Sequence, residues 1–119
     1  MPSTTTYKAG DVVVVLYQHT DGRGQGKRPA VVVSTEGHNR RALDVVLMPL
    51  TSRLHRAADP GAVVVEDWEA AGLLRPSIAK PALFSFPATD IYKHLGRVGK
   101  ATRAKLSRAL AEILGLRTS

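Results

Sequence analysis

The chain has 119 residues, the size of one ordinary domain, and 44% of them are hydrophobic, which argues against a disordered protein. Lysine and arginine number 17 against 10 aspartates and glutamates, and the resulting net charge of +7 favours a polyanionic partner, nucleic acid before an acidic protein or a membrane surface. The sequence contains no cysteine, which excludes disulfides, thiolate catalysis and cysteine-ligated zinc.

The first half of the chain predicts three strands, because runs of β-branched and aliphatic residues alternate with turn-forming ones. The first run is so uniformly apolar that we expect it to be buried on both faces. Glycines recur in the segment after it, which is typical of a solvent-facing loop. We expect Pro49 to end the third strand. The predicted segments are a strand at Asp11–Tyr17, a loop at His19–Lys27, a strand at Pro29–Ser34, a turn at Glu36–Asn39 and a strand at Ala42–Met48.

The second half predicts shorter strands and one late helix. Trp68–Gly72 has the composition of a short helical turn ended by its glycine, and we expect Trp68 in the core. Pro81 indicates an edge or a bulge. The tail repeats apolar residues at helical spacing, with Gly115 as a stop. The predicted segments are a polar, basic loop at Thr51–Gly61, a strand at Ala62–Val65, one or two strands within Ser77–Phe86, and a helix at Lys100–Leu116 whose apolar face holds Leu106, Ala109, Leu110, Ile113 and Leu114.

These elements predict a mainly β fold, a small twisted sheet or half-open barrel covered by a helix, in one domain over residues 1–119. A strict alternation of apolar and polar residues is missing, so the pattern does not set the strand order. The histidines His38, His55 and His94 lack metal-ligand spacing, and we expect them on the surface. No segment resembles a signal peptide or a transmembrane helix, so we expect a cytoplasmic protein.

Four short blocks follow one another along the chain. They are Gly10-Asp11 before the first strand, the run from Gly26 to Val33 that reads Gly-Lys-Arg-Pro-Ala-Val-Val-Val, Pro49-Leu50-Thr51-Ser52 after the third strand, and Leu95–Gly99 before the helix. In this order and spacing they resemble the PemK/MazF ribonuclease toxins over effectively the whole chain.

The resemblance implies a small SH3-like, PemK-type β-barrel with a C-terminal amphipathic helix, a homodimer, and metal-independent cleavage of single-stranded messenger RNA. In that reaction the ribose 2′-hydroxyl attacks the neighbouring phosphorus and leaves a 2′,3′-cyclic phosphate and a 5′-hydroxyl. No cofactor is implied. The resemblance also implies a cognate antitoxin, whose acidic disordered segment would cover the basic surface of the toxin.

By this resemblance the catalytic arginine is Arg28 and the catalytic threonine is Thr51, with Ser52 beside it. The residue types suit the reaction, because a guanidinium can meet two phosphoryl oxygens at once and the hydroxyls can bind the phosphate or orient the 2′-hydroxyl. Pro29 would hold the backbone beside the arginine. The candidate substrate-binding residues around these groups are Gly22, Arg23, Gln25, Lys27, Arg53 and Lys80.

The proton-transfer group differs from the family pattern. Family members often carry a carboxylate shortly before the arginine, where this chain has Arg23-Gly24-Gln25, and another on a later strand, where it has Lys80-Pro81. Because an imidazole titrates near neutral pH, as acid–base transfer requires, His19 is the candidate substitute. The missing carboxylates leave an alternative open, a non-cleaving module on the same barrel that binds nucleic acid or a protein such as gyrase.

Overall fold

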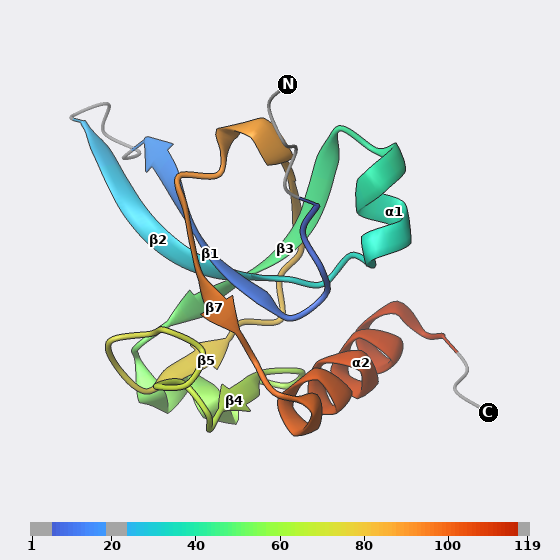
Figure 1. The fold of residues 1–119 in the computed structure, drawn as a ribbon. Coiled ribbons are helices and arrows are strands. Elements are labelled where there is room, and N and C mark those ends of the chain that lie inside the picture. The colour runs from blue at the N-terminus through green and yellow to red at the C-terminus, as the bar shows by residue number, and fades with distance from the viewer. Residues whose placement is uncertain (1–5, 19–23, 117–119) are drawn as a thin grey trace.

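Strands β1 and β2 form a long antiparallel hairpin on which the rest of the chain is assembled, as Figure 1 shows for the computed structural model. The structure describes residues 6–18 and 24–116. The strands are β1 (Asp11–Gln18), β2 (Gln25–Val32), β3 (Asp44–Thr51), β4 (Val63–Val65), β5 (Ser77–Ala79), β6 (Phe84–Pro87) and β7 (Lys93–Arg97). The helices are α1 (Glu36–Arg41) and α2 (Lys100–Leu114), with 3₁₀ turns at Leu54–Ala58 and Ala88–Asp90.

Strand β3 joins the parts of the sheet, because it pairs in turn with β6, β2 and β5. All pairings are antiparallel, and the strand order is β4-β5-β3-β2-β1-β7 with β6 beside β3. The change of partner along β3 curls the sheet into a half-barrel, and α2 packs beside β4 below it in Figure 1.

The sequence predicted that Pro49 would end the third strand. Pro49 instead lies inside β3. It is the last β3 residue to pair with β2, opposite Ala30, and Leu50 after it pairs with β5. Because a proline lacks a backbone N–H, it fits best where a ladder ends. Its carbonyl oxygen still accepts a hydrogen bond from the backbone N–H of Lys80 at 2.9 Å. The third strand therefore runs on to Thr51.

The core consists of two apolar clusters on opposite faces of the hairpin. Neighbouring residues of β1 point to opposite faces, and both Val12 and Val13 are fully buried, which confirms the expected burial of the first strand on both faces. Trp68 packs against the first cluster, also as expected. The first cluster includes Val12, Val31, Met48, Leu50, Val65 and Leu106, and the second consists of Val13, Val15, Ala30, Val32, Val45 and Leu47.

The predicted loop before the second strand was too long. Residues 25–28 already belong to β2, because they pair with the end of β1 in the register Leu16 to Lys27 and Tyr17 to Gly26. The second strand begins at Gln25, four residues before the predicted Pro29, and ends at Val32. Glycine content pointed to a loop here, whereas one of these glycines lies in the ladder.

The predicted turn at Glu36–Asn39 is the first part of helix α1. Thr35 caps the helix, since its hydroxyl oxygen accepts a hydrogen bond from the backbone N–H of His38 at 3.2 Å. Within the predicted loop Thr51–Gly61 the chain forms a 3₁₀ turn at Leu54–Ala58. Both departures are short helical segments, and neither has a buried residue.

The strands and the helix predicted in the second half of the chain are confirmed, but the prediction that Pro81 lies at a strand edge or a bulge was wrong, and one strand was missed. Ser77–Phe86 supplies two strands, β5 and the start of β6, with Pro81 between them rather than in either. Helix α2 ends at Gly115, whose φ of 68° is the left-handed cap conformation expected of a terminal glycine. Strand β7 was not predicted, because Lys93–Arg97 has no β-branched residue.

Among the described helices, none combines the length and the apolar character needed to cross a membrane.

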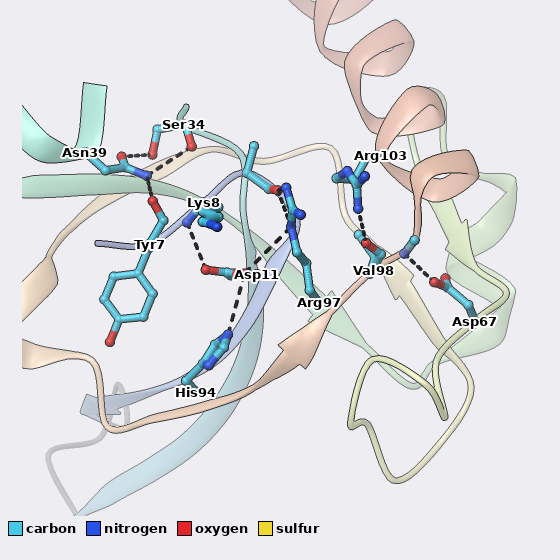
Figure 2. Close-up of polar contacts among 12 residues, drawn as sticks. Tyr7, Lys8, Asp11, Ser34, Asn39, Asp67, His94, Arg97, Val98 and Arg103 are labelled. Atoms are coloured by element: carbon cyan, nitrogen blue, oxygen red, sulfur yellow. Dashed lines mark hydrogen bonds and ion pairs between the residues drawn. The ribbon is translucent and has the colours of Figure 1, made fainter. Parts of the chain in front are cut away.

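Asp11 ties the start of the hairpin to β7. Figure 2 shows its carboxylate facing the side chains of His94 and Arg97 from that strand, at 3.5 and 3.9 Å, and accepting a hydrogen bond from the backbone N–H of Lys8 at 2.8 Å. The carboxylate is almost fully buried, whereas both basic side chains are about half exposed. The Gly10-Asp11 block therefore fixes the edge strand in place.

Asp67 plays a similar part for helix α2. Its carboxylate accepts a hydrogen bond from the backbone N–H of Gly99, drawn in Figure 2, and another from the hydroxyl of Thr102. Asp67 therefore caps the first turn of the helix from a distant segment. Partial burial alone would raise the pKa of Asp67. The hydrogen bonds from Thr102 and Gly99 and the charge of Arg103 outweigh burial and lower the pKa below its ordinary 3.8.

Replacing Asp67 by alanine is expected to lower the free energy of unfolding by about 1–2 kcal/mol, the usual cost of losing a helix cap. Because the folded-state pKa is lowered, the contribution of Asp67 is present above its ordinary pKa of 3.8 and is lost as the pH falls through the lowered value. Urea unfolding of wild type and Asp67→Ala should therefore differ at pH 7 and converge in acid. Glu69→Ala, an exposed carboxyl in the same turn, is the control; an equal loss there would contradict the capping role.

Candidate functional site

A groove of about 890 Å³ is walled by the β1–β2 hairpin, the end of β3, the segment 72–77 and β7. Its described lining includes five basic side chains and no carboxylate. These side chains come from four separate parts of the chain, so the fold concentrates positive charge that is dispersed in the sequence. Such a groove attracts a polyanion. The basic residues are Lys27, Arg28, Arg53, Arg75 and Lys93.

Arg28 is held against an aromatic ring. In the β1–β2 ladder Arg28 lies opposite Val15, and Tyr17 lies opposite Gly26, so the two side chains are diagonal neighbours on one face. The guanidinium carbon of Arg28 lies 4.8 Å from the centroid of the Tyr17 ring, which is a cation–π contact. A Cβ atom at Gly26 would overlap that ring. The glycine therefore leaves the space in which the ring lies and on which the arginine rests.

Lys27 makes a second contact of this kind. Its Nζ donates a hydrogen bond to the Tyr92 hydroxyl oxygen at 3.1 Å and lies 4.5 Å from the centroid of that ring. The hydrogen bond from Lys27 and its positive charge lower the pKa of Tyr92, and Lys93 adds to the effect. The Tyr92 side chain is still half exposed.

Thr51 and Ser52 bring hydroxyl groups to the groove at the end of β3. Thr51 pairs with Ile78 of β5, and its hydroxyl oxygen accepts a hydrogen bond from the backbone N–H of Arg53 at 3.2 Å. This local turn directs the chain so that Arg53 also lines the groove. The hydroxyl proton of Thr51 is left to donate to a further acceptor.

The structure brings together five of the ten predicted site residues. They are Arg28, Thr51, Ser52, Lys27 and Arg53. His19, Gly22 and Arg23 lie outside the described residues. Gln25 is the first residue of β2 and pairs with Gln18. Lys80 follows β5, where its backbone N–H donates a hydrogen bond to the carbonyl oxygen of Pro49, and it is not among the described residues that line the groove.

Sequence reasoning missed several groove residues. Tyr17, Tyr92, Arg75 and Lys93 come from segments that no motif marks, and the Lys27–Tyr92 contact joins residues 65 positions apart. Arg75 lies in the segment Leu73-Leu74-Arg75-Pro76 after Gly72, and only the structure shows that Leu74 beside it is 93% exposed.

Comparisons with known proteins identify the family and the fold. The model of the family described as PemK-like, MazF-like toxin of type II toxin–antitoxin system matches residues 8–114. A comparison with curated proteins gave no match.

Solved structures with the same fold include toxins from two bacterial groups. The chain is similar to an endoribonuclease in complex with its cognate antitoxin from a mycobacterial species, at 25% identity over 98% of this chain and 100% of that one, with a TM-score of 0.73. It is also similar to the MazE–MazF structure from Deinococcus radiodurans, at 20% identity over 96% and 100%, with a TM-score of 0.78. A third is the Mycobacterium tuberculosis toxin MazF-mt6, at 18% identity over 89% and 99%, with a TM-score of 0.69. The predicted PemK-type barrel with a C-terminal helix is confirmed.

The substitution Gly26→Ala is expected to move the Tyr17 ring without unfolding the hairpin. The atoms that a Cβ would meet are at the far end of the tyrosine side chain, so the ring can swing aside while the backbone keeps its register. Arg28 then loses its aromatic support. In NMR spectra the side-chain protons of Arg28, shifted upfield by the ring in the wild type, should move toward their ordinary positions.

Gly37→Ala in helix α1 is the matched control, since an added Cβ there meets nothing within 4 Å. Unchanged Arg28 signals in Gly26→Ala would show that the ring does not depend on this glycine.

Proposed function

Because the chain belongs to the PemK-like, MazF-like toxin family of type II toxin–antitoxin systems, we propose that it is an endoribonuclease that cleaves single-stranded RNA in the basic groove. The observation that carries the proposal is the groove lining, which among the described residues holds five cations, Arg28 included, and no carboxylate, together with the hydroxyls of Thr51 and Ser52. The similarity to a mycobacterial endoribonuclease over nearly the full length of both chains supports it.

The chemistry follows from the groups in the groove. The 2′-hydroxyl of the substrate attacks the adjacent phosphorus, and negative charge grows on the phosphoryl oxygens in the transition state. Arg28 meets that charge with a guanidinium already oriented by the Tyr17 ring, so little reorganisation is needed as the charge develops. Thr51 and Ser52 bind the phosphate or orient the attacking hydroxyl. The products are a 2′,3′-cyclic phosphate and a 5′-hydroxyl, and no metal takes part.

The same groove is the proposed target of an antitoxin. An acidic, disordered segment would find complementary charge along Lys27, Arg53, Arg75 and Lys93 and would block Arg28 as it folds onto the surface. The similar mycobacterial and Deinococcus structures are toxin–antitoxin complexes, which supports this partner. We extend the proposal to a homodimer in the cytoplasm, as the family resemblance implies.

The test of the enzymatic proposal is cleavage of a mixed single-stranded RNA in EDTA. Wild-type protein should cut at a limited set of sites and leave cyclic-phosphate ends, and Arg28→Ala should lower the rate about 10²–10³-fold, the usual effect of removing one preorganised transition-state donor. Arg108→Ala, an exposed cation on α2 away from the groove, should cut at the wild-type rate. RNA that stays intact while it binds the wild-type protein would favour the non-cleaving module instead.

Binding in the groove should show in the salt dependence of RNA affinity. If Arg75 contacts a phosphate, Arg75→Ala should reduce the slope of log K against log salt by about 0.7, the contribution of one neutralised phosphate in a single strand. Arg108→Ala again serves as the control and should leave the slope unchanged. Equal slopes for wild type and Arg75→Ala, measured by fluorescence anisotropy with a short RNA, would place the RNA elsewhere.

A further inference from the structure

The hydroxyl of Tyr92 is placed to donate a proton into the groove. An ammonium group has donors and no acceptor, so in the 3.1 Å hydrogen bond between Lys27 and Tyr92 the phenolic oxygen is the acceptor. The proton of the Tyr92 hydroxyl is therefore left for a third group. Tyr92 is 51% exposed and its side chain lines the groove, so that third group can be a bound substrate.

Tyr92 also lies close to Arg28 in the sheet. The backbone N–H of Tyr92 donates to the carbonyl oxygen of Val14 on one edge of β1, and Arg28 pairs with the next residue, Val15, on the other edge. Two strand spacings, about 10 Å, thus separate the two backbones. Lys27 reaches across β1 to the Tyr92 hydroxyl, and Lys27, Arg28 and Tyr92 all line the same groove. A phosphate bound at Arg28 therefore has Tyr92 in the same groove.

On these grounds we propose that Tyr92 is the general acid of the reaction, the residue that protonates the 5′-oxygen as it leaves the phosphorus. The inference rests on the proposed ribonuclease function and assigns one of its two proton transfers, which the sequence had left without a carboxylate to perform it.

The 2′-oxygen forms a bond to phosphorus and its proton passes to solvent water, while the bond from phosphorus to the 5′-oxygen breaks. The Tyr92 hydroxyl gives its proton to that 5′-oxygen, which becomes the free 5′-hydroxyl. The phenolate that remains takes a proton back from water. No oxidant, reductant or metal is needed.

Lys27 makes the phenol a better acid. Its ammonium group already contacts the oxygen that becomes negative, so it stabilises the phenolate directly, and Lys93 adds positive charge nearby. Both effects lower the pKa of Tyr92 from its ordinary value near 10, toward the range in which a general acid works well. Lys27 therefore acts through Tyr92, as a positioning and tuning residue.

The decisive experiment compares two leaving groups. On ordinary RNA, Tyr92→Phe should cleave about 10²–10³-fold more slowly than the wild type, the range expected for loss of a general acid. On the same RNA with sulfur in place of the 5′-bridging oxygen at the cut site, the two proteins should cleave at similar rates, because a thiolate leaves without protonation. Arg28→Ala should stay slow on both substrates. Tyr7→Phe, which removes a hydroxyl outside the groove, is the matched control.

A pH profile gives a second, independent test. A general acid must be protonated, so the rate should fall as the pH rises through the pKa of Tyr92. Lys27→Met removes the charge that lowers this pKa and should move that falling limb to higher pH, whereas Lys100→Met, at the exposed start of α2, should not move it.

Two results would overturn the inference while leaving the proposed function intact. One is wild-type cleavage of ordinary RNA by Tyr92→Phe, and the other is an equal loss with oxygen and sulfur leaving groups, which would mean that Tyr92 only binds or supports the groove. A wild-type protein that cleaves neither substrate would overturn the proposed function as well.

Discussion

The register of the β1–β2 hairpin determines where the chemical groups of the groove lie. Pairing Val15 with Arg28 puts Tyr17 opposite Gly26, and this one alignment gives the arginine its aromatic support. A shift by one residue would send Arg28 to the opposite face, away from Tyr17, and would turn Val31 and Val32 out of the clusters that they now fill. The buried valines of β1, which fill both clusters, make such a shift costly. Core packing therefore fixes the site geometry.

The other edge of β1 completes the groove. Strand β7 pairs with β1 through a bulge between Val12 and Val13, and the buried carboxylate of Asp11 holds its far end through His94 and Arg97. This anchoring places Tyr92, just before β7, where Lys27 can reach it across β1. Asp11 does not line the groove itself, but by holding β7 it helps to set the position of Tyr92, which does.

The part of this arrangement that follows from sequence is the local part. Arg28 beside Pro29 and Thr51 after Pro49 lie in short blocks that can be recognised without a structure, and Gly115 marks a helix end by its conformational freedom. Tyr92 could not be found in this way, because its role depends on a contact with a residue 65 positions earlier. The place of Pro49 inside β3 depends on a change of strand partner, which also leaves no local pattern.

The groove cations differ in how they are held, and this difference bears on catalysis. Arg53, Arg75 and Lys93 are exposed side chains that attract phosphate along the whole strand, in the ground state as much as in the transition state. Attraction that is equal in both states strengthens binding and leaves the rate of the bound complex unchanged. Arg28 and Lys27 instead each rest on a tyrosine ring, so part of their conformational freedom is already lost before substrate arrives. A group fixed in advance can favour one charge distribution over another, which is why rate enhancement should depend on these two residues and affinity on the other three.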